Sequence, residues 1–204
     1  MICGYEYGHS KHDEYLEREC KDEIELKSSK ILTFSNKSAI FDSPYDKRII
    51  KWFGLFEHPL EENGESNFDK CLLQTNWCDD QGHHVENYNR FLDESNVSNF
   101  LKHANEYMPM VLMFMGSKLI HYLQHESIKD RFLEIFGEEI KKLKFVTKDF
   151  EGRQFKIGFQ KFEKTTIVSF PHPSGTRGLS DGYIKLFQPE ISAILIEFKQ
   201  LRRF

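Results

Sequence analysis

The sequence lacks the long apolar segment that a membrane protein needs. Its longest apolar run, Met108 to Met115, is interrupted by Pro109 and is far shorter than the roughly 20 residues of a membrane-spanning helix. No signal peptide opens the chain. We therefore expect an intracellular, cytoplasmic protein that does not enter a membrane, and we expect it to be a monomer.

Cysteine is scarce and shows no ligand spacing. Cys3, Cys20, Cys71 and Cys78 form no CxxC pair, which argues against a zinc ribbon and against a dense disulfide framework. An iron–sulfur cluster needs four ligands that converge, and a whole predicted βα unit separates the first two cysteines from the last two. We interpret all four as buried, reduced thiols.

Metal-binding motifs are also missing around the histidines. His9, His12 and Asp13 form one polar group and His83 with His84 forms another, but neither has a recognisable ligand spacing on a helix. We predict solvated loop histidines and no metal site.

The charge balance excludes a strongly basic domain. The sequence has 28 Lys and Arg against 32 Asp and Glu, a formal net charge of −4. Nucleic-acid binding usually needs an excess of cations, although a local basic face is sufficient for a small site. The sequence also lacks a GxSxG motif, which counts against a small-molecule α/β hydrolase.

What the sequence does contain is one domain, residues 1–204, in which predicted strands alternate with amphipathic helices. This order favours a three-layer α/β/α fold around a central, mainly parallel sheet of about four strands. Phe145 to Phe162 alternates with period two around a Glu151-Gly152 turn, which predicts an antiparallel hairpin. Predicted strands are 30–35, 71–75, 110–115 and 166–170, and predicted helices include 13–27, 49–56, 97–108, 128–140 and one starting at Pro189.

Polar or glycine-rich turns follow four of the predicted strands. They are residues 4–9, 76–82, 116–117 and 172–178. Ligands of parallel sheets gather beyond the carboxyl ends of the strands, so these turns predict the position of a binding site.

Five segments carry a resemblance to one family. Pro171-His172-Pro173-Ser174-Gly175, directly after a buried strand, resembles the HPS-type motif of the uracil-DNA glycosylase superfamily. Gly4-Tyr5-Glu6-Tyr7-Gly8 is similar to its first-strand motif. Leu32-Thr33-Phe34-Ser35 resembles the segment whose Phe stacks on the base, and Leu73-Gln74-Thr75-Asn76 the strand end whose Asn reads the base edge. Val111 to Ser117 resembles the third strand with its Gly-Ser ending.

The resemblance implies a DNA glycosylase that hydrolyses the N-glycosidic bond of uracil, or a related damaged base, flipped out of DNA. It implies DNA as the partner and a reaction without metal or nucleotide cofactor. Its functional positions fall on catalytic Glu6 and His172, on base-binding Tyr5, Phe34 and Asn76, and on DNA-binding Pro173, Ser174, Gly175, Thr176 and Arg177.

Each position also has a structural alternative. His172 can donate a hydrogen bond to the carbonyl of the departing base, for which a neutral imidazole suffices, or it is a buried structural histidine. Asn76 offers a donor and an acceptor to a pyrimidine edge, or it ends a strand in a turn. Phe34 supplies a stacking face or belongs to the core. Glu6 stabilises a cationic sugar or is an exposed turn residue.

The loop after His172 is expected to contact DNA. Ser174 and the following amides are suited to a phosphate, and Thr176 and Arg177 lie where family members insert a side chain into the base stack. We expect Glu6, Phe34, Asn76 and His172 to line one pocket. Arg177, Lys118 and Arg153 are predicted to form a basic rim beside it. The resemblance is incomplete, because Glu6 replaces the Asp of the most active members and Tyr7 replaces a proline.

These departures leave a second function open. The chain is either an active glycosylase or a non-catalytic member of the same fold that binds a nucleobase or nucleic acid.

Overall fold

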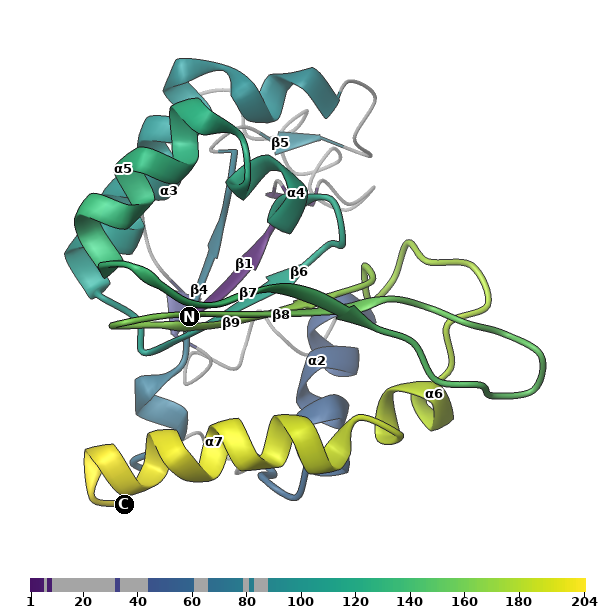
Figure 1. Ribbon diagram of the computed structural model, residues 1–204. Coiled ribbons are helices and arrows are strands. Elements are labelled where there is room, and N and C mark those ends of the chain that lie inside the picture. Colours follow the sequence, from purple (N-terminus) through teal and green to yellow (C-terminus); the bar gives the residue numbers. More distant parts are fainter. Residues whose placement is uncertain (6, 9–31, 34–43, 61–65, 79–80, 83–87) are drawn as a thin grey trace, which may run out of the picture.

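The computed structural model describes residues 1–5, 7–8, 32–33, 44–60, 66–78, 81–82 and 88–204. In these ranges helices cover both faces of one mixed β-sheet, so the α/β class is confirmed (Figure 1). The sheet has seven strands in the order β3-β4-β1-β6-β9-β8-β7. Their bounds are Leu32–Thr33 (β3), Leu73–Asn76 (β4), Ile2–Gly4 (β1), Val111–Met115 (β6), Thr166–Phe170 (β9), Ile157–Phe162 (β8) and Glu139–Val146 (β7).

The centre of this sheet is parallel. β1 lies between β4 and β6 and is parallel to both, and β6 is parallel to β9 along its whole length, from Val111↔Thr166 to Met115↔Phe170. The prediction that 111–115 and 166–170 share one sheet is therefore confirmed. Because these four strands run in one direction, their carboxyl ends lie at one edge of the sheet.

Strand β6 shows why a central parallel strand is apolar throughout. Met113 and Met115 belong to the core on one face of the sheet, whereas Leu112 and Phe114 belong to the core on the other. Each face is covered by helices. Those on the first face are α2 (Pro44–Leu55), α6 (Asp181–Lys185) and α7 (Gln188–Arg202), and those on the second are α3 (Glu94–Tyr107), α4 (Leu119–Leu123) and α5 (Glu126–Phe136) (Figure 1).

Several short elements complete the described fold. Two 3₁₀ turns, η2 (Asp69–Cys71) and η3 (Tyr88–Leu92), flank the sheet, and β2 (Tyr7–Gly8) pairs in parallel with β5 (Gln81–Gly82) apart from it. Pro189 lies in the first turn of α7, as predicted. No helix in the described ranges is long and apolar enough to cross a bilayer.

The expectation of about four strands was too low, because antiparallel strands extend the parallel centre on both sides. β3 adds to β4, and the β7–β8 hairpin adds to β9 through pairs such as Gly158↔Ser169. The hairpin itself was predicted, with its turn. Glu151 and Gly152 have positive φ values of 51° and 70°, and Phe150 bridges Arg153 across them.

The predicted helix through Ile140 was wrong at its end. Helix α5 stops at Phe136, because Gly137 follows with a positive φ of 78° and donates its N–H to Leu133. Ile140 instead lies in the edge strand β7 and is 57% exposed. The spacing of Ile140 from Phe136 matched a helix face by coincidence.

Candidate functional site

His172 follows strand β9 and is fixed by its own loop. The backbone N–H of Gly175 donates to Nδ1 of His172 over 2.9 Å, and the N–H of Thr176 donates to the His172 carbonyl over 3.2 Å. The hydroxyl of Ser174 lies 3.4 Å from the same Nδ1. Hydrogen bonds within the loop therefore fix both the backbone conformation and the ring orientation of His172.

These contacts determine the protonation of the imidazole. A backbone N–H can only donate, so Nδ1 of His172 is an acceptor and the ring proton lies on Nε2. Burial lowers the pKa of His172 further below its ordinary value. No described residue accepts a hydrogen bond from Nε2. His172 thus presents a neutral ring with one N–H donor that remains available to a ligand.

Two tyrosine rings contact the His172 ring. Tyr5 stacks parallel to it, with ring centroids 5.7 Å apart and an interplanar angle of 1°. Tyr45, from the first turn of α2, lies 5.3 Å away at 40°. Tyr5 was predicted from the sequence as a site residue, whereas Tyr45 was not.

Tyr5 is held at the end of strand β6. Its ring covers Gly116, where an added Cβ would lie 2.6 Å from the Tyr5 hydroxyl oxygen. That oxygen accepts the backbone N–H of Lys118 over 3.3 Å. Burial raises the pKa of Tyr5 to about 12, so its phenol is neutral at physiological pH. Tyr5 therefore joins the ends of β1, β6 and β9.

Asn76 is the last residue of β4 and lies opposite Gly4 of β1. It is 8% exposed, and its side-chain oxygen occupies the space that a Cβ on Gly4 would need. The same Cβ would lie 3.1 Å from the hydroxyl of Tyr45. The missing side chain of Gly4 thus allows the Asn76 amide and the Tyr45 hydroxyl to approach one another.

The structure consequently brings three of the predicted residues to one edge of the sheet. His172, Tyr5 and Asn76 come from the ends of β9, β1 and β4. Tyr45 contacts the His172 ring, and its hydroxyl lies near Gly4, the residue opposite Asn76. Glu6 and Phe34, also predicted for this site, lie outside the described residues.

Nothing in the sequence pattern selected Tyr45. It follows Pro44 at a helix start, belongs to no motif, and is a half-buried aromatic residue of a common kind. Its burial and its neighbours are the only signals. The Tyr45 hydroxyl is buried without a hydrogen-bond partner among the described residues, and burial raises its pKa well above the ordinary value.

Arg48, which the sequence analysis did not identify, holds both ends of the loop formed by residues 172–179 (the His172 loop). Its guanidinium donates to the carbonyls of Pro173 and Leu179, and its Nε donates to Asp181 over 3.2 Å. The same Asp181 oxygen accepts the indole N–H of Trp52 over 3.1 Å. Helix α2 is thereby tied to the loop and to the start of α6.

The predicted cations lie on this side of the molecule. Arg177 is exposed in the loop itself, and Arg153 donates to the Gly178 carbonyl over 2.8 Å. Lys118 follows the end of β6, with its ammonium nitrogen 3.2 Å from the ring centroid of Tyr88. In the same region Asp181 is neutralised by Arg48 and by Lys51, whose ammonium is 2.6 Å away.

The DNA-binding residues predicted for the loop differ in exposure. Ser174, Gly175 and Arg177 are exposed, Thr176 is half-buried, and Pro173 is buried. The amides of Gly175 and Thr176 donate within the loop, whereas the side chains of Ser174 and Arg177 are exposed.

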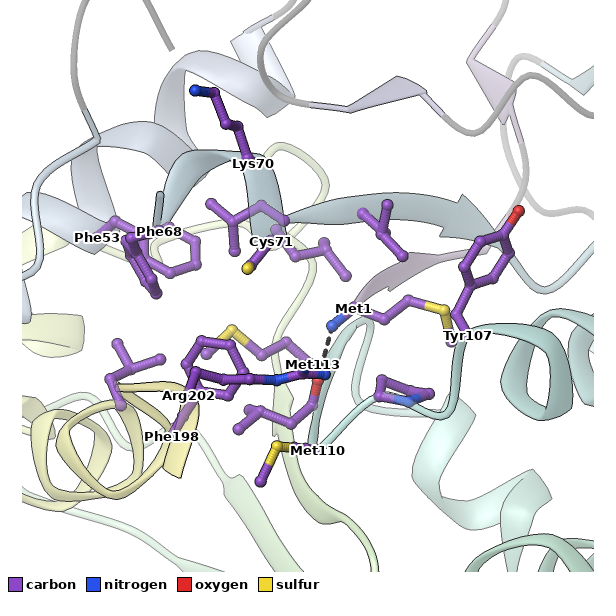
Figure 2. A pocket seen from close by; sticks show the side chains of 16 residues that line it. Met1, Phe53, Phe68, Lys70, Cys71, Tyr107, Met110, Met113, Phe198 and Arg202 are labelled. Carbon is purple, nitrogen blue, oxygen red and sulfur yellow. Dashed lines mark hydrogen bonds between the residues drawn. The ribbon is translucent and has the colours of Figure 1, made fainter. Parts of the chain in front are cut away.

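A cavity lies at the opposite edge of the sheet. It has a volume of about 210 Å³ and is lined mainly by apolar side chains between the starts of β1, β4 and β6 and helix α7 (Figure 2). The amino group of Met1 donates to the Val111 carbonyl there over 2.7 Å, and burial lowers its pKa to about 5. This cavity is therefore separate from the polar side chains that converge around His172 at the other edge of the sheet.

Three of the four cysteines, Cys3, Cys71 and Cys78, lie in the described ranges and form no disulfide there. The same ranges contain no group of three His, Cys, Asp or Glu side chains that could hold a metal ion. Cys20 and the histidine groups at 9–12 and 83–84 lie outside those ranges.

Comparison with known proteins leaves the family open. No protein-family model matches the chain, and no curated protein matches it at a significant level.

Proposed function

We propose that the chain is a DNA glycosylase that hydrolyses the N-glycosidic bond of uracil, or of a related damaged base, flipped out of DNA. The observation that supports this best is that His172, with a neutral imidazole N–H, and Asn76, with its amide, lie at the same edge of the sheet. The His172 N–H suits the leaving base, on which negative charge develops. The Asn76 amide suits recognition of the edge of that base.

In this reaction the oxygen of a water molecule bonds to the anomeric carbon, and the bond from that carbon to the base nitrogen breaks. The proton that the water loses is finally taken up by the departed base, so the products are the abasic sugar and the neutral base. The electron pair of the bond goes to the base, whose carbonyl oxygen becomes negative. The Nε2–H of His172 stabilises that charge as it forms, without transferring its proton. The Asn76 amide holds the base by a donor and an acceptor together. We assign the stabilisation of the cationic sugar to Glu6 and base stacking to Phe34.

Contacts to DNA are assigned to the rim of the site. Arg177, Lys118 and Arg153 provide a local positive surface despite the net charge of −4. We assign phosphate binding to Ser174 and Arg177, whose side chains are exposed. With so few cations, the logarithm of affinity should fall with the logarithm of salt concentration with a slope of only about −2 to −3.

A non-catalytic nucleobase- or nucleic-acid-binding protein is the second candidate. It is favoured by the chemistry of the described site residues, since Tyr5, Tyr45, Asn76 and His172 are all neutral groups. Such groups suffice to bind a base, whereas hydrolysis also needs a charge that faces the sugar.

The deciding experiment is a cleavage assay. The protein is incubated with single- and double-stranded oligonucleotides that contain uracil, hypoxanthine or an oxidised pyrimidine, and heating in alkali then reveals abasic sites. Strand breaks at one modified base support the glycosylase. Binding to these oligonucleotides without breaks supports the second candidate, and salt-independent or undetectable binding contradicts both.

A further inference from the structure

We infer that Tyr45 is a further base-contacting residue of this site, and that its hydroxyl forms a hydrogen bond with the nucleobase edge that Asn76 reads. The inference rests on the proposed function, because it requires a base to occupy the site.

The first observation is that the Tyr45 hydroxyl is buried and has no hydrogen-bond partner within the described ranges. A buried polar atom without a partner is costly, and proteins satisfy nearly all such atoms. Neighbouring polar groups on helix α2 follow that rule, since Asp46 accepts the Gln74 amide over 3.1 Å and Arg48 makes three hydrogen bonds. The Tyr45 hydroxyl is the exception on helix α2. The buried hydroxyls of Thr165 and Ser169 also lack a partner among the described residues, but the Tyr45 side chain is the one of these three that contacts the His172 ring.

The second observation is the position of this hydroxyl. It lies 3.1 Å from the point that a Cβ on Gly4 would occupy, a point that overlaps the side-chain oxygen of Asn76. The Tyr45 ring at the same time contacts the ring of His172, at 5.3 Å between centroids. Tyr45 is therefore located between the residue that reads the base edge and the residue that faces its carbonyl.

The third consideration is chemical. A phenol carries one donor and can also accept, so it can complement a carbonyl or a ring N–H of a pyrimidine. Burial keeps the Tyr45 phenol protonated, which preserves its donor. A planar base bound against Asn76 and His172 would give the hydroxyl the partner that it lacks.

The test is a substitution that removes only the hydroxyl, Tyr45→Phe. Binding of uracil is measured by calorimetry and KM by the cleavage assay, with thermal unfolding recorded in parallel. We expect binding to weaken and KM to rise by about tenfold, the effect of one lost hydrogen bond. The melting temperature should stay the same or rise, because Phe removes an unsatisfied buried group. Tyr107→Phe, at the opposite edge of the sheet, is the matched control and should change neither uracil binding nor KM.

The outcomes separate this inference from the proposed function. If the wild type binds and cleaves while Tyr45→Phe behaves identically, the glycosylase stands and the role of Tyr45 is wrong. A marked loss of thermal stability in Tyr45→Phe assigns the hydroxyl to the fold and also overturns the inference. If the wild type neither binds uracil nor cleaves, the proposed function fails and the role of Tyr45 fails with it.

Discussion

The backbone N–H of Gly175 points at Nδ1 of His172, 2.9 Å away. This single hydrogen bond excludes a proton from Nδ1 and places it on Nε2, the nitrogen that remains available to a ligand. Burial acts in the same direction, because it lowers the pKa of His172. The pKa of His172 is therefore lower than the ordinary value for a histidine, which favours the neutral ring.

The protonation state predicts how the protein responds to pH. If neutral His172 is the active form, turnover should be constant at neutral pH and fall only as the pH drops through the lowered pKa, below the ordinary value of about 6.5. A rate–pH profile measures this. Activity that rises on acidification would contradict the assignment, since it would require the charged imidazole.

Stability should depend on pH with the same sign. Unfolding restores the ordinary pKa of His172, so the unfolded chain binds the proton first when the pH falls below about 6.5. Its contribution therefore makes the folded state less stable in acid, and has no effect above that pH. Urea unfolding at pH 7 and pH 5, compared between wild type and His172→Ala, measures the difference. His121→Ala, an exposed histidine that stacks on Phe145, is the control and should behave like the wild type.

The sequence predicted those features of the fold that depend on local residue patterns. Residues 110–115 are apolar at every position, and residues 166–170 are apolar except at Thr166 and Ser169, because both faces of a strand inside the sheet are buried; this pattern identified β6 and β9. The turns after the strands then located Asn76 and His172, since parallel strands end at one edge. The strand-end rule gave the turns 76–82 and 172–178, and the resemblance singled out Asn76 and His172 within them.

Contacts between distant segments could not be predicted in this way. Tyr45 and Arg48 belong to a helix that reads as an ordinary amphipathic one, and their importance comes from Gly4, Pro173 and Leu179, which lie elsewhere in the sequence. β3 and the β7–β8 hairpin were expected as strands, but their membership of the central sheet was not predicted, because periodicity detects a strand without identifying the strand it pairs with.

Gly116 should be required for the position of Tyr5. An added Cβ would meet the Tyr5 ring and lie 2.6 Å from its hydroxyl oxygen, so Gly116→Ala must displace the ring that stacks on His172. We expect a loss of about 1–3 kcal/mol in the free energy of unfolding, as for other overpacked sites, together with reduced turnover. Denaturant unfolding and the cleavage assay measure the two effects.

Gly54→Ala is the matched control for this substitution. A Cβ on Gly54 would have no atom within 4 Å, and the residue is exposed in helix α2. Alanine should therefore stabilise the helix by about 0.5–1 kcal/mol and leave turnover unchanged. Equal effects of the two substitutions would show that Tyr5 has no special relation to Gly116.

Arg48 should matter more than the neighbouring cation on the same helix. Arg48→Met leaves the carbonyls of Pro173 and Leu179 without their donor, and we expect a loss of about 1–3 kcal/mol of stability and a more mobile His172 loop. Lys51→Met removes only an exposed ion pair with Asp181, which is worth less than about 1 kcal/mol. Thermal unfolding and amide hydrogen exchange of residues 172–179 distinguish the two variants. Equal protection of these amides from exchange in both variants would contradict the role of Arg48 in holding the loop.

His172→Ala should reduce turnover far more than substrate binding. The Nε2–H of His172 gains strength only as negative charge accumulates on the departing base, so its loss acts on the transition state. Removal of one such donor typically costs about 2.7–4 kcal/mol, or roughly 10²–10³ in kcat, while KM changes little. Single-turnover kinetics on a uracil-containing oligonucleotide measure the chemical step, and a melting curve establishes that the variant is folded. His121→Ala should retain wild-type kinetics. Full turnover in a folded His172→Ala variant would make His172 a structural histidine, whose role is to accept the Gly175 N–H and order the loop, and would leave Asn76 and Tyr45 as the parts of a binding site.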